Sequence, residues 1–174
     1  MIRKQPWFER QFPSGLPVSV LPILLERLRG TPARVEERLA PLAEAVLTRR
    51  SGSTWTIQEN AGHLLDLEPL WLRRVEDLAS RRLELAPADL TNRRTHEANH
   101  NATPPATLLG EFRRARAALV ARLESTEAER ATYAALHPRL QQPMNLMDHA
   151  YFVAEHDDYH LARITELLAE FDAG

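Results

Sequence analysis

The sequence reads NLMDHAYFVAEHDDYHLARITELLAEF over residues 145–171, and this stretch predicts one long amphipathic helix. Positions three or four apart share one face of a helix, which here is expected to face the interior of a helical bundle. The residues at these positions are His149, Val153, His156, His160, Ile164, Leu167 and Phe171. Asn145 is the expected N-cap, and Asp148 places a favourable negative charge in the first turn.

The N-terminal part of the chain predicts a short helix and then a longer one. The short helix covers residues 18–29 and is expected to stop at Gly30. In the Thr31-Pro32 pair that follows Gly30, Thr31 is the expected N-cap and Pro32 is the first residue of a helix that extends to about Thr48. Pro41 lies inside that helix and should kink it, because proline removes one backbone hydrogen bond.

Two more helices are predicted on either side of a long connection. The first begins at Thr56 with a capping box, in which Thr56 and Glu59 satisfy each other's backbone donors, and should bend near Pro69. Residues 81–103 are polar and predict a crossover with little regular structure. The next helix covers about 103–125, with Thr103 as N-cap.

Four long amphipathic helices around one core predict a four-helix bundle with a long crossover between the second and third main helices. The 174 residues are expected to form a single domain, in which residues 1–30 are an N-terminal extension and a short helix. Residues 1–16 should be irregular, with Trp7, Phe8 and Phe12 capping the bundle. The segment 127–144 predicts no more than a turn of helix.

The composition excludes several classes of protein. Aromatic residues make up only 6% of the chain, which favours helices over a β-sandwich. The net charge of −2 provides no cationic field for nucleic acid or a membrane surface. There is no cysteine, so no disulfide or Cys-ligated metal can form within the chain. Neither a signal peptide nor a membrane span is recognisable, so a cytoplasmic location is expected.

The pair His156 and His160 is the strongest chemical signal. Helical residues four apart lie about 5–6 Å from each other at Cβ, so both imidazoles can bind one metal ion. Two buried, hydrogen-bonded neutral histidines are the competing interpretation. His63 is the only histidine predicted in the middle of another helix, and it is therefore the candidate third ligand.

The other histidines are expected to lie elsewhere. His149 shares the face of His156 but lies about 10 Å away along the helix axis, where it could carry protons in a pocket. His137 looks like a loop residue. His96 and His100 repeat the same spacing without an apolar stripe, so a solvated loop is expected for both.

Together these motifs resemble the DinB/YfiT-like family of metal-dependent enzymes. The matching stretches are LRGTPAR at 28–34, WTIQENAGHLLDLE at 55–68 and HDDYHLARI at 156–164, and the likeness extends over nearly the whole chain. The resemblance implies a four-helix bundle with a long crossover. It also implies a divalent metal ion, zinc or nickel, held by His63, His156 and His160. Several relatives transfer low-molecular-weight thiols such as bacillithiol or mycothiol.

A metal with three histidine ligands and an open position supports two reactions. A metal-activated thiolate attacks an electrophile, or metal-activated water hydrolyses an ester or amide. His149 and Tyr159 are the candidate catalytic residues, although Tyr159 also fits a packing role. The candidate acceptors that orient the ligand rings are Glu59, Asp66 and Glu68, and arginines of the segment 91–96 are candidates for binding an anionic thiol or substrate.

Other functions remain open. A non-catalytic, metal-stabilised bundle that acts as a binding or stress-response module is the main alternative. A ferritin-like di-iron site is disfavoured, because it needs two Glu-x-x-His motifs and the chain has one, from Glu97 to His100. The expected partner is a small molecule such as a low-molecular-weight thiol. A homodimer is compatible with a helical bundle.

Overall fold

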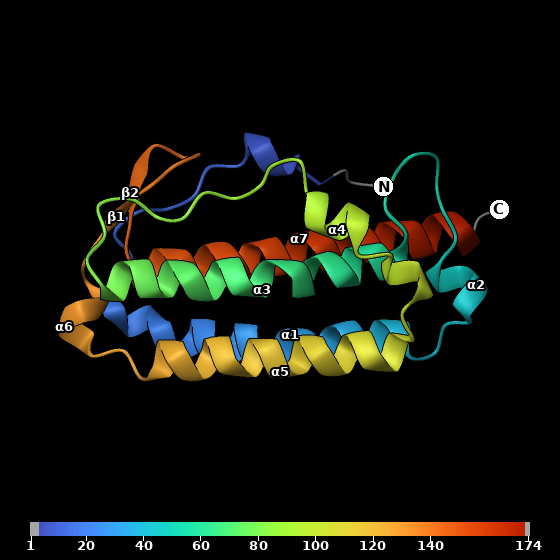
Figure 1. Cartoon of the computed structure of the whole chain (residues 1–174), viewed down its shortest axis with the longest axis horizontal. Helices are drawn as coiled ribbons and strands as arrows, with labels where there is room; N and C mark the ends of the chain where they lie inside the picture. Colours follow the sequence, from blue (N-terminus) through green and yellow to red (C-terminus); the bar gives the residue numbers. More distant parts are fainter. Residues whose placement is uncertain (1–3, 173–174) are drawn as a thin grey trace.

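Four long helices form the body of the protein in the computed structural model, which describes residues 4–172. They are α1 (Leu21–Leu39), α3 (Ile57–Ala79), α5 (Pro105–Glu124) and α7 (Leu146–Asp172). α1 and α3 each pack against both α5 and α7. Figure 1 shows α1 and α7 running in one direction and α3 and α5 in the other. The predicted four-helix bundle is confirmed. No helix of this described part has the length and apolar character needed to span a bilayer.

The connection between α3 and α5 returns along the whole bundle because these two neighbouring helices are parallel (Figure 1). This confirms the predicted crossover. The returning segment contains two short helical pieces, α4 (Arg93–Glu97) and a 3₁₀ turn (His100–Ala102). Its first part is fixed to the rest of the protein by a hydrogen bond from the Leu85 amide to the Leu136 carbonyl.

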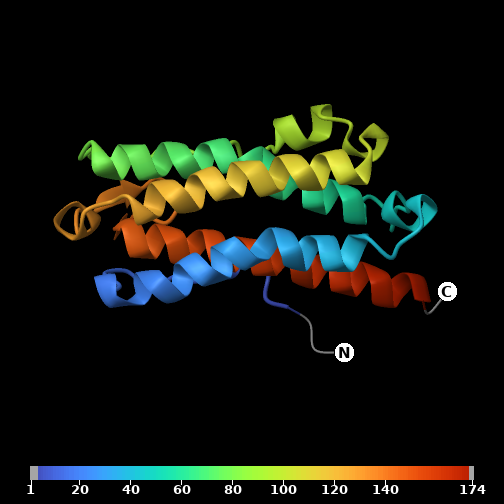
Figure 2. The same cartoon turned by 90° about the horizontal axis from the view of Figure 1, so that it is seen from below.

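Short elements close the two ends of the bundle (Figure 2). α2 (Glu44–Leu47) connects α1 to α3, and α6 (Ala128–Ala131) follows α5. A two-stranded antiparallel hairpin then occupies the segment for which at most a helical turn was predicted, with β1 (Ala135–His137) and β2 (Gln142–Met144).

The N-terminal segment caps one side of the bundle, as predicted for two of its three aromatic residues. It contains 3₁₀ turns at Trp7–Glu9 and Val18–Val20. The rings of Trp7 and Phe12 lie 5.2 and 4.8 Å from the ring of Phe152 on α7. The prediction is wrong for Phe8, whose surface is 64% exposed. The part of the prediction that concerns residues 1–3 lies outside the described residues.

The prediction of two helices separated at Gly30 is wrong, because α1 continues through Gly30 and Pro32 and ends at Leu39, before Pro41. A proline at position 32 cannot donate the helical hydrogen bond to the carbonyl of Leu28. Nη1 of Arg116 on α5 donates to that carbonyl instead, at 3.2 Å. Thr31 is therefore not an N-cap; its hydroxyl lies 2.8 Å from Oδ2 of Asp157.

The starts of the other main helices were predicted in two of three cases. At the start of α3, Thr56 and Glu59 form the predicted capping box. Asn145 and Asp148 make the corresponding reciprocal hydrogen bonds before α7, each 2.9 Å long. The predicted Thr103 cap is wrong, because Pro104 occupies that position and no side chain caps α5.

The interior consists of two apolar clusters with a layer of polar side chains between them. Each long helix contributes one polar residue to this layer, and all are buried: Thr31, Glu68, Arg116 and Asp157. One apolar cluster contains Leu28, Trp71, Leu119 and Val153, and the other contains Val35, Leu64, Phe112 and Leu161. The layer therefore lies at the same level on all four helices.

Substitution of Gly62 tests how the crossover docks on α3. A Cβ atom at Gly62 would lie 2.3 Å from Cδ2 of His100, so Gly62→Ala must displace the buried imidazole. We expect a loss of about 1–3 kcal/mol in the free energy of unfolding, measured by urea denaturation. Gly30→Ala is the matched control, because nothing lies within 4 Å of its Cβ position and a helical alanine should stabilise α1 by about 0.5–1 kcal/mol. Equal effects of the two substitutions would contradict this account of the docking.

Candidate metal centre

Three imidazoles converge between α3 and α7. His63 comes from α3, and His156 and His160 come from successive turns of α7. One nitrogen of each ring lies within 4.8 Å of one nitrogen of each of the other two. The ring centroids are 4.6 Å apart for the α7 pair, and 5.3 and 4.8 Å from His63 to His156 and to His160. All three side chains are buried.

Two residues that the sequence reasoning missed orient two of these rings. Nδ1 of His160 lies 2.9 Å from Oδ1 of Asn60, an oxygen that can only accept, so Nδ1 carries the hydrogen and the other nitrogen keeps its lone pair. Nδ1 of His63 lies 2.9 Å from the hydroxyl of Thr95, in α4 of the crossover. Asn60 stands one turn before His63, a spacing that the sequence makes visible, whereas nothing in the sequence pointed to Thr95.

Burial makes the three imidazoles neutral at pH 7. It is the main cause that lowers the pKa of His63 to about 4, although Asp66 opposes the shift. Burial, followed by the neighbouring imidazoles, lowers the pKa of His156 and His160 well below the usual value. Neutral imidazole is the form that binds metal ions.

The three tryptophans of the chain surround the cluster. The rings of Trp7 and Trp71 lie 5.1 and 5.5 Å from the ring of His156. The ring of Trp55 lies 4.6 Å from that of His63. These large apolar side chains exclude water from the imidazoles, and a low local dielectric strengthens any charge interaction there.

The two predicted catalytic residues lie on different sides of the cluster. Tyr159 is half-buried, with its ring 5.7 Å from the ring of His160 and 5.6 Å from that of Trp7. His149 is fully buried, and its Nε2 lies 3.0 Å from the carbonyl oxygen of Trp71. Burial lowers the pKa of His149 to about 3, so its ring is neutral and donates to that carbonyl.

None of the three acidic residues considered as acceptors for these rings forms a hydrogen bond with one of them within residues 4–172. Glu59 belongs to the capping box and binds Arg50. Asp66 lies 2.8 Å from Nε2 of His100 and also pairs with Arg94. Burial alone would raise the pKa of Asp66, but hydrogen bonds from His100 and Thr95 outweigh it and lower the pKa.

Two histidines are placed differently from the prediction. His100 is buried against Gly62 and Asp66, so the expected solvated loop is wrong for this residue, whereas His96 is exposed as predicted. His137, expected in a loop, ends strand β1 and is 2% exposed. Its partner is Arg74 of α3, whose Nη1 lies 3.1 Å from Nε2 of His137.

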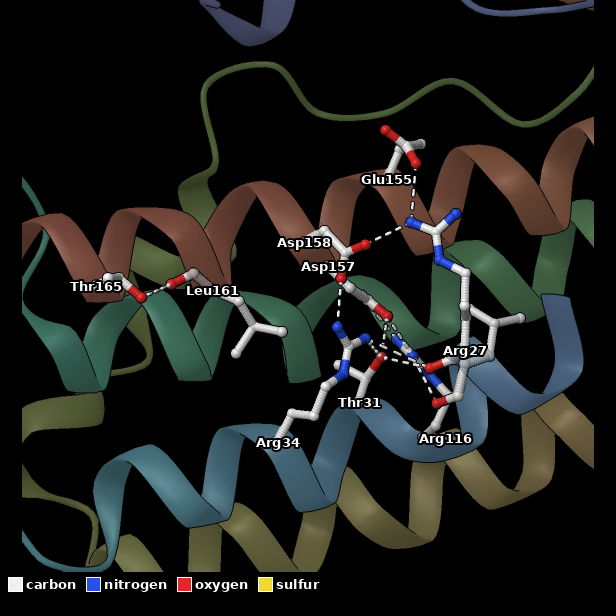
Figure 3. A network of polar contacts seen from close by, with 10 residues as sticks. Arg27, Thr31, Arg34, Arg116, Glu155, Asp157, Asp158, Leu161 and Thr165 are labelled. Carbon is white, nitrogen blue, oxygen red and sulfur yellow. Dashed lines mark hydrogen bonds and ion pairs between the residues drawn. The ribbon is translucent and has the colours of Figure 1, made fainter. Parts of the chain in front are cut away.

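The buried ion pairs next to His156 join α3, α5 and α7, and hydrogen bonds to Thr31 and to the Leu28 carbonyl add α1. Arg116 binds Glu68 through Nε and Nη2 at 2.9 and 2.6 Å, and it also binds both oxygens of Asp157. Figure 3 shows the Asp157 side chain between Arg116 and Thr31. Near the surface, Arg27 and Arg34 both pair with Asp158 (Figure 3). Because Asp157 follows His156 directly, these pairs hold the turn of α7 that carries His156.

A helical bundle with a long crossover and a buried group of three histidines from two helices is a recognisable class of protein. The sequence profile of the DinB superfamily matches residues 27–164, and the chain therefore belongs to the DinB superfamily. No protein with a curated description matches the sequence.

The solved structures that share the fold include YfiT and an isomerase. YfiT from Bacillus subtilis, described as a probable metal-dependent hydrolase with an unusual four-helix bundle topology, has 17% sequence identity and a TM-score of 0.80, with 94% of each chain covered. The mycothiol-dependent maleylpyruvate isomerase has 14% identity and a TM-score of 0.66 over 84% of this chain. The present chain spans 60% of the length of the isomerase.

Glu68→Gln tests the charge balance of the polar layer. Burial is the main cause that raises the pKa of Glu68 from 4.5 to about 7. The nearby carboxylate of Asp157 raises it further, and Arg116 opposes the shift. The folded protein therefore holds this proton more tightly than the unfolded chain. The corresponding stabilisation is present below pH 4.5 and is lost as the pH rises through about 7. We expect the free energy of unfolding to fall more between pH 5 and 7 in the wild type than in Glu68→Gln, measured by urea denaturation.

Glu76→Gln is the control for this experiment. Glu76 is exposed on the same helix, and its hydrogen bond with Arg122 lowers its pKa, so its contribution has the opposite sign. Parallel pH dependences of the wild type and Glu68→Gln would show that Glu68 is ionised throughout this range.

Proposed function

We propose that the protein is a metal-dependent enzyme in which His63, His156 and His160 hold one divalent ion, zinc or nickel, and that it transfers a low-molecular-weight thiol to an electrophile. The observation that carries this proposal is the convergence of three buried, neutral imidazoles from two helices. Hydrolysis is the second candidate, supported by the similarity to YfiT over 94% of both chains.

The residues present fit such an ion. Zn–N bonds of about 2.0–2.1 Å place the ligand nitrogens of one tetrahedral ion roughly 3.3 Å apart, which small rotations of the observed rings would reach. The hydrogen bonds to Asn60 and Thr95 leave the second nitrogen of His160 and His63 available for a metal. Nδ1 of His156 is buried and has no hydrogen-bond partner among residues 4–172. Without such an ion, only the hydrogen bonds to Asn60 and Thr95 would compensate for the apolar packing that three buried imidazoles give up.

The chain's own residues prepare the site for a bound nucleophile. When bound, an ion with three neutral ligands lowers the pKa of a thiol or water that reaches it, so that a nucleophile forms at neutral pH. Asn60 and Thr95 hold two ligand rings in position, and the three tryptophans keep bulk water away. The chain has no cysteine, so the reacting thiol must belong to a substrate.

The predicted catalytic residues differ in how well they fit this function. Tyr159 stands next to His160 and is half-buried, so this side chain is close enough to the cluster to serve as a proton donor. His149 is separated from the cluster by Trp71, whose carbonyl oxygen it binds. A role of His149 as proton carrier stays a prediction, and its geometry suits the positioning of Trp71.

Metal analysis tests the ligand set. We expect about one zinc or nickel ion per purified chain, and loss of this ion in His156→Ala and in His160→Ala, because each substitution leaves only two ligands. The measurement is elemental analysis after dialysis, with circular dichroism to confirm that the variants are folded. His96→Ala is the control, because this exposed imidazole lies outside the cluster. Metal content unchanged by the two ligand substitutions would refute the site.

Two assays distinguish the reactions. Conjugation of bacillithiol, mycothiol or glutathione to a reporter electrophile should depend on the metal, so a chelator should abolish it and His156→Ala should lack it. Hydrolysis of reporter esters and amides is measured with the same proteins. Hydrolysis without thiol transfer would favour the second candidate. A metal-loaded protein inactive in both assays would favour a non-catalytic, metal-stabilised module.

A further inference from the structure

A cavity of about 240 Å³ lies next to the candidate metal centre, on the far side of Trp71. Its walls come from α3, α7, the crossover and the segment after β1, and the residues that line it include Trp71, Arg74, Leu90, His137, Arg139 and Phe152. Trp71 belongs to both places, because it lines the cavity and its ring lies 5.5 Å from that of His156.

Two guanidinium groups reach this cavity without a carboxylate partner. Arg74 is 1% exposed, and neither Arg74 nor Arg139 forms an ion pair within the described range 4–172. Nε of Arg74 donates to the carbonyl of Ala86 at 2.9 Å. Burial, followed by the charge of Arg139, lowers the pKa of Arg74 to about 10, with Asp77 opposing the shift. A buried charge of this kind is costly unless an opposite charge compensates it.

His137 adds one more hydrogen-bond donor to the lining of the cavity. Nε2 of His137 faces Nη1 of Arg74 at 3.1 Å, and its Nδ1 faces the backbone amides of Arg139 and Leu140, both at 3.2 Å. Burial lowers the pKa of His137 to about 3, so the ring is neutral and carries one hydrogen. At one of its two nitrogens, an N–H group therefore faces another N–H group.

Two residues that line the cavity carry a further hydrogen-bond donor without an acceptor among residues 4–172. Nη2 of Arg139 and Nε1 of Trp71 are buried, and neither has a hydrogen-bond partner among residues 4–172. Aromatic rings hold the guanidinium groups, because Arg74 lies over Trp71 at 5.5 Å and Arg139 over Phe152 at 5.9 Å. The cavity thus combines apolar walls with several positioned donors, as a site for a small anion does. No acidic residue of the described part of the chain lines it, because Asp77 lies outside the lining and binds Arg73 and the Ala86 amide.

We propose that this cavity binds the carboxylate of a small molecule that reacts at the adjacent histidine cluster, with Arg74 and Arg139 as its main partners. A carboxylate fits the planar guanidinium forks and supplies the acceptors that the surplus donors lack. The assignment of the reacting molecule rests on the proposed metal-dependent function, whereas carboxylate binding itself does not. The carboxylate belongs either to the thiol or to the electrophile.

Calorimetric titration with succinate tests the binding step, with succinamide as the uncharged probe. We expect succinate to bind the wild type, and Arg139→Gln to weaken this binding by at least about tenfold, because one charged partner is lost. Arg73→Gln is the matched control: Arg73 is the exposed neighbour of Arg74, and the substitution removes the same charge without touching the cavity. Arg139 is only partly buried, so its substitution should leave the fold intact, as thermal denaturation will show.

The same titration with His156→Ala separates this proposal from the proposed function. Succinate binding retained in His156→Ala and lost in Arg139→Gln supports a carboxylate site that does not depend on a metal. Binding lost in His156→Ala but unaffected by Arg139→Gln would assign the carboxylate to the metal centre and overturn the proposal. Equal binding of succinate and succinamide, or no binding of succinate to the wild type, would also overturn it.

Two pairs of substrates identify the source of the carboxylate once turnover is established. Cysteine and cysteamine differ only in the carboxylate of the thiol, and a carboxylic electrophile can be paired with its amide in the same way. Arg139→Gln should raise KM for the molecule that carries the recognised carboxylate and leave KM for its counterpart without that carboxylate unchanged. If Arg139→Gln changes KM in none of the four combinations of thiol and electrophile, the proposed role in the reaction is overturned.

Discussion

The whole bundle depends on one guanidinium group, that of Arg116. It binds Glu68 on α3, Asp157 on α7 and the Leu28 carbonyl on α1, so all four long helices meet at this side chain of α5. Apolar packing alone allows helices to slide past one another, whereas buried ion pairs fix a register because a shift would leave a charge unpaired. Because an unpaired buried charge is costly, these ion pairs restrict the relative positions of the helices.

The position of the histidine cluster follows from that constraint. His156 immediately precedes Asp157 on α7, and His63 lies just over one turn before Glu68 on α3. When Arg116 holds Glu68 and Asp157 together, the turns that carry these two histidines are brought to the same level of the bundle. The apolar clusters on either side of the polar layer stabilise the helices, and the layer itself determines which residues face each other.

The sequence was sufficient for features that depend on local patterns. The start of α3 at Thr56, the start of α7 at Asn145 and the inward stripe of α7 all rest on residues close together in the chain. It was insufficient where distant residues decide. The helix continues through Pro32 because Arg116, 88 residues after Leu28, supplies the missing hydrogen bond. His100 is buried because Gly62 leaves room for its ring and Asp66 accepts its hydrogen bond.

The role of each arginine depends on the groups that its side chain binds. All but one of the 22 basic residues are arginines, spread along the chain, and this pattern alone indicates compositional bias. Many of them pair with carboxylates at the surface, as Arg27 and Arg34 do with Asp158, and such exposed pairs contribute little to stability. Arg116 is buried with two carboxylates, whereas Arg74 is as deeply buried with none among the described residues. Since both charges bear the cost of leaving water, the lack of a directly paired carboxylate at Arg74 among residues 4–172 supports the proposed anion site there, whereas Arg116 holds the helices together.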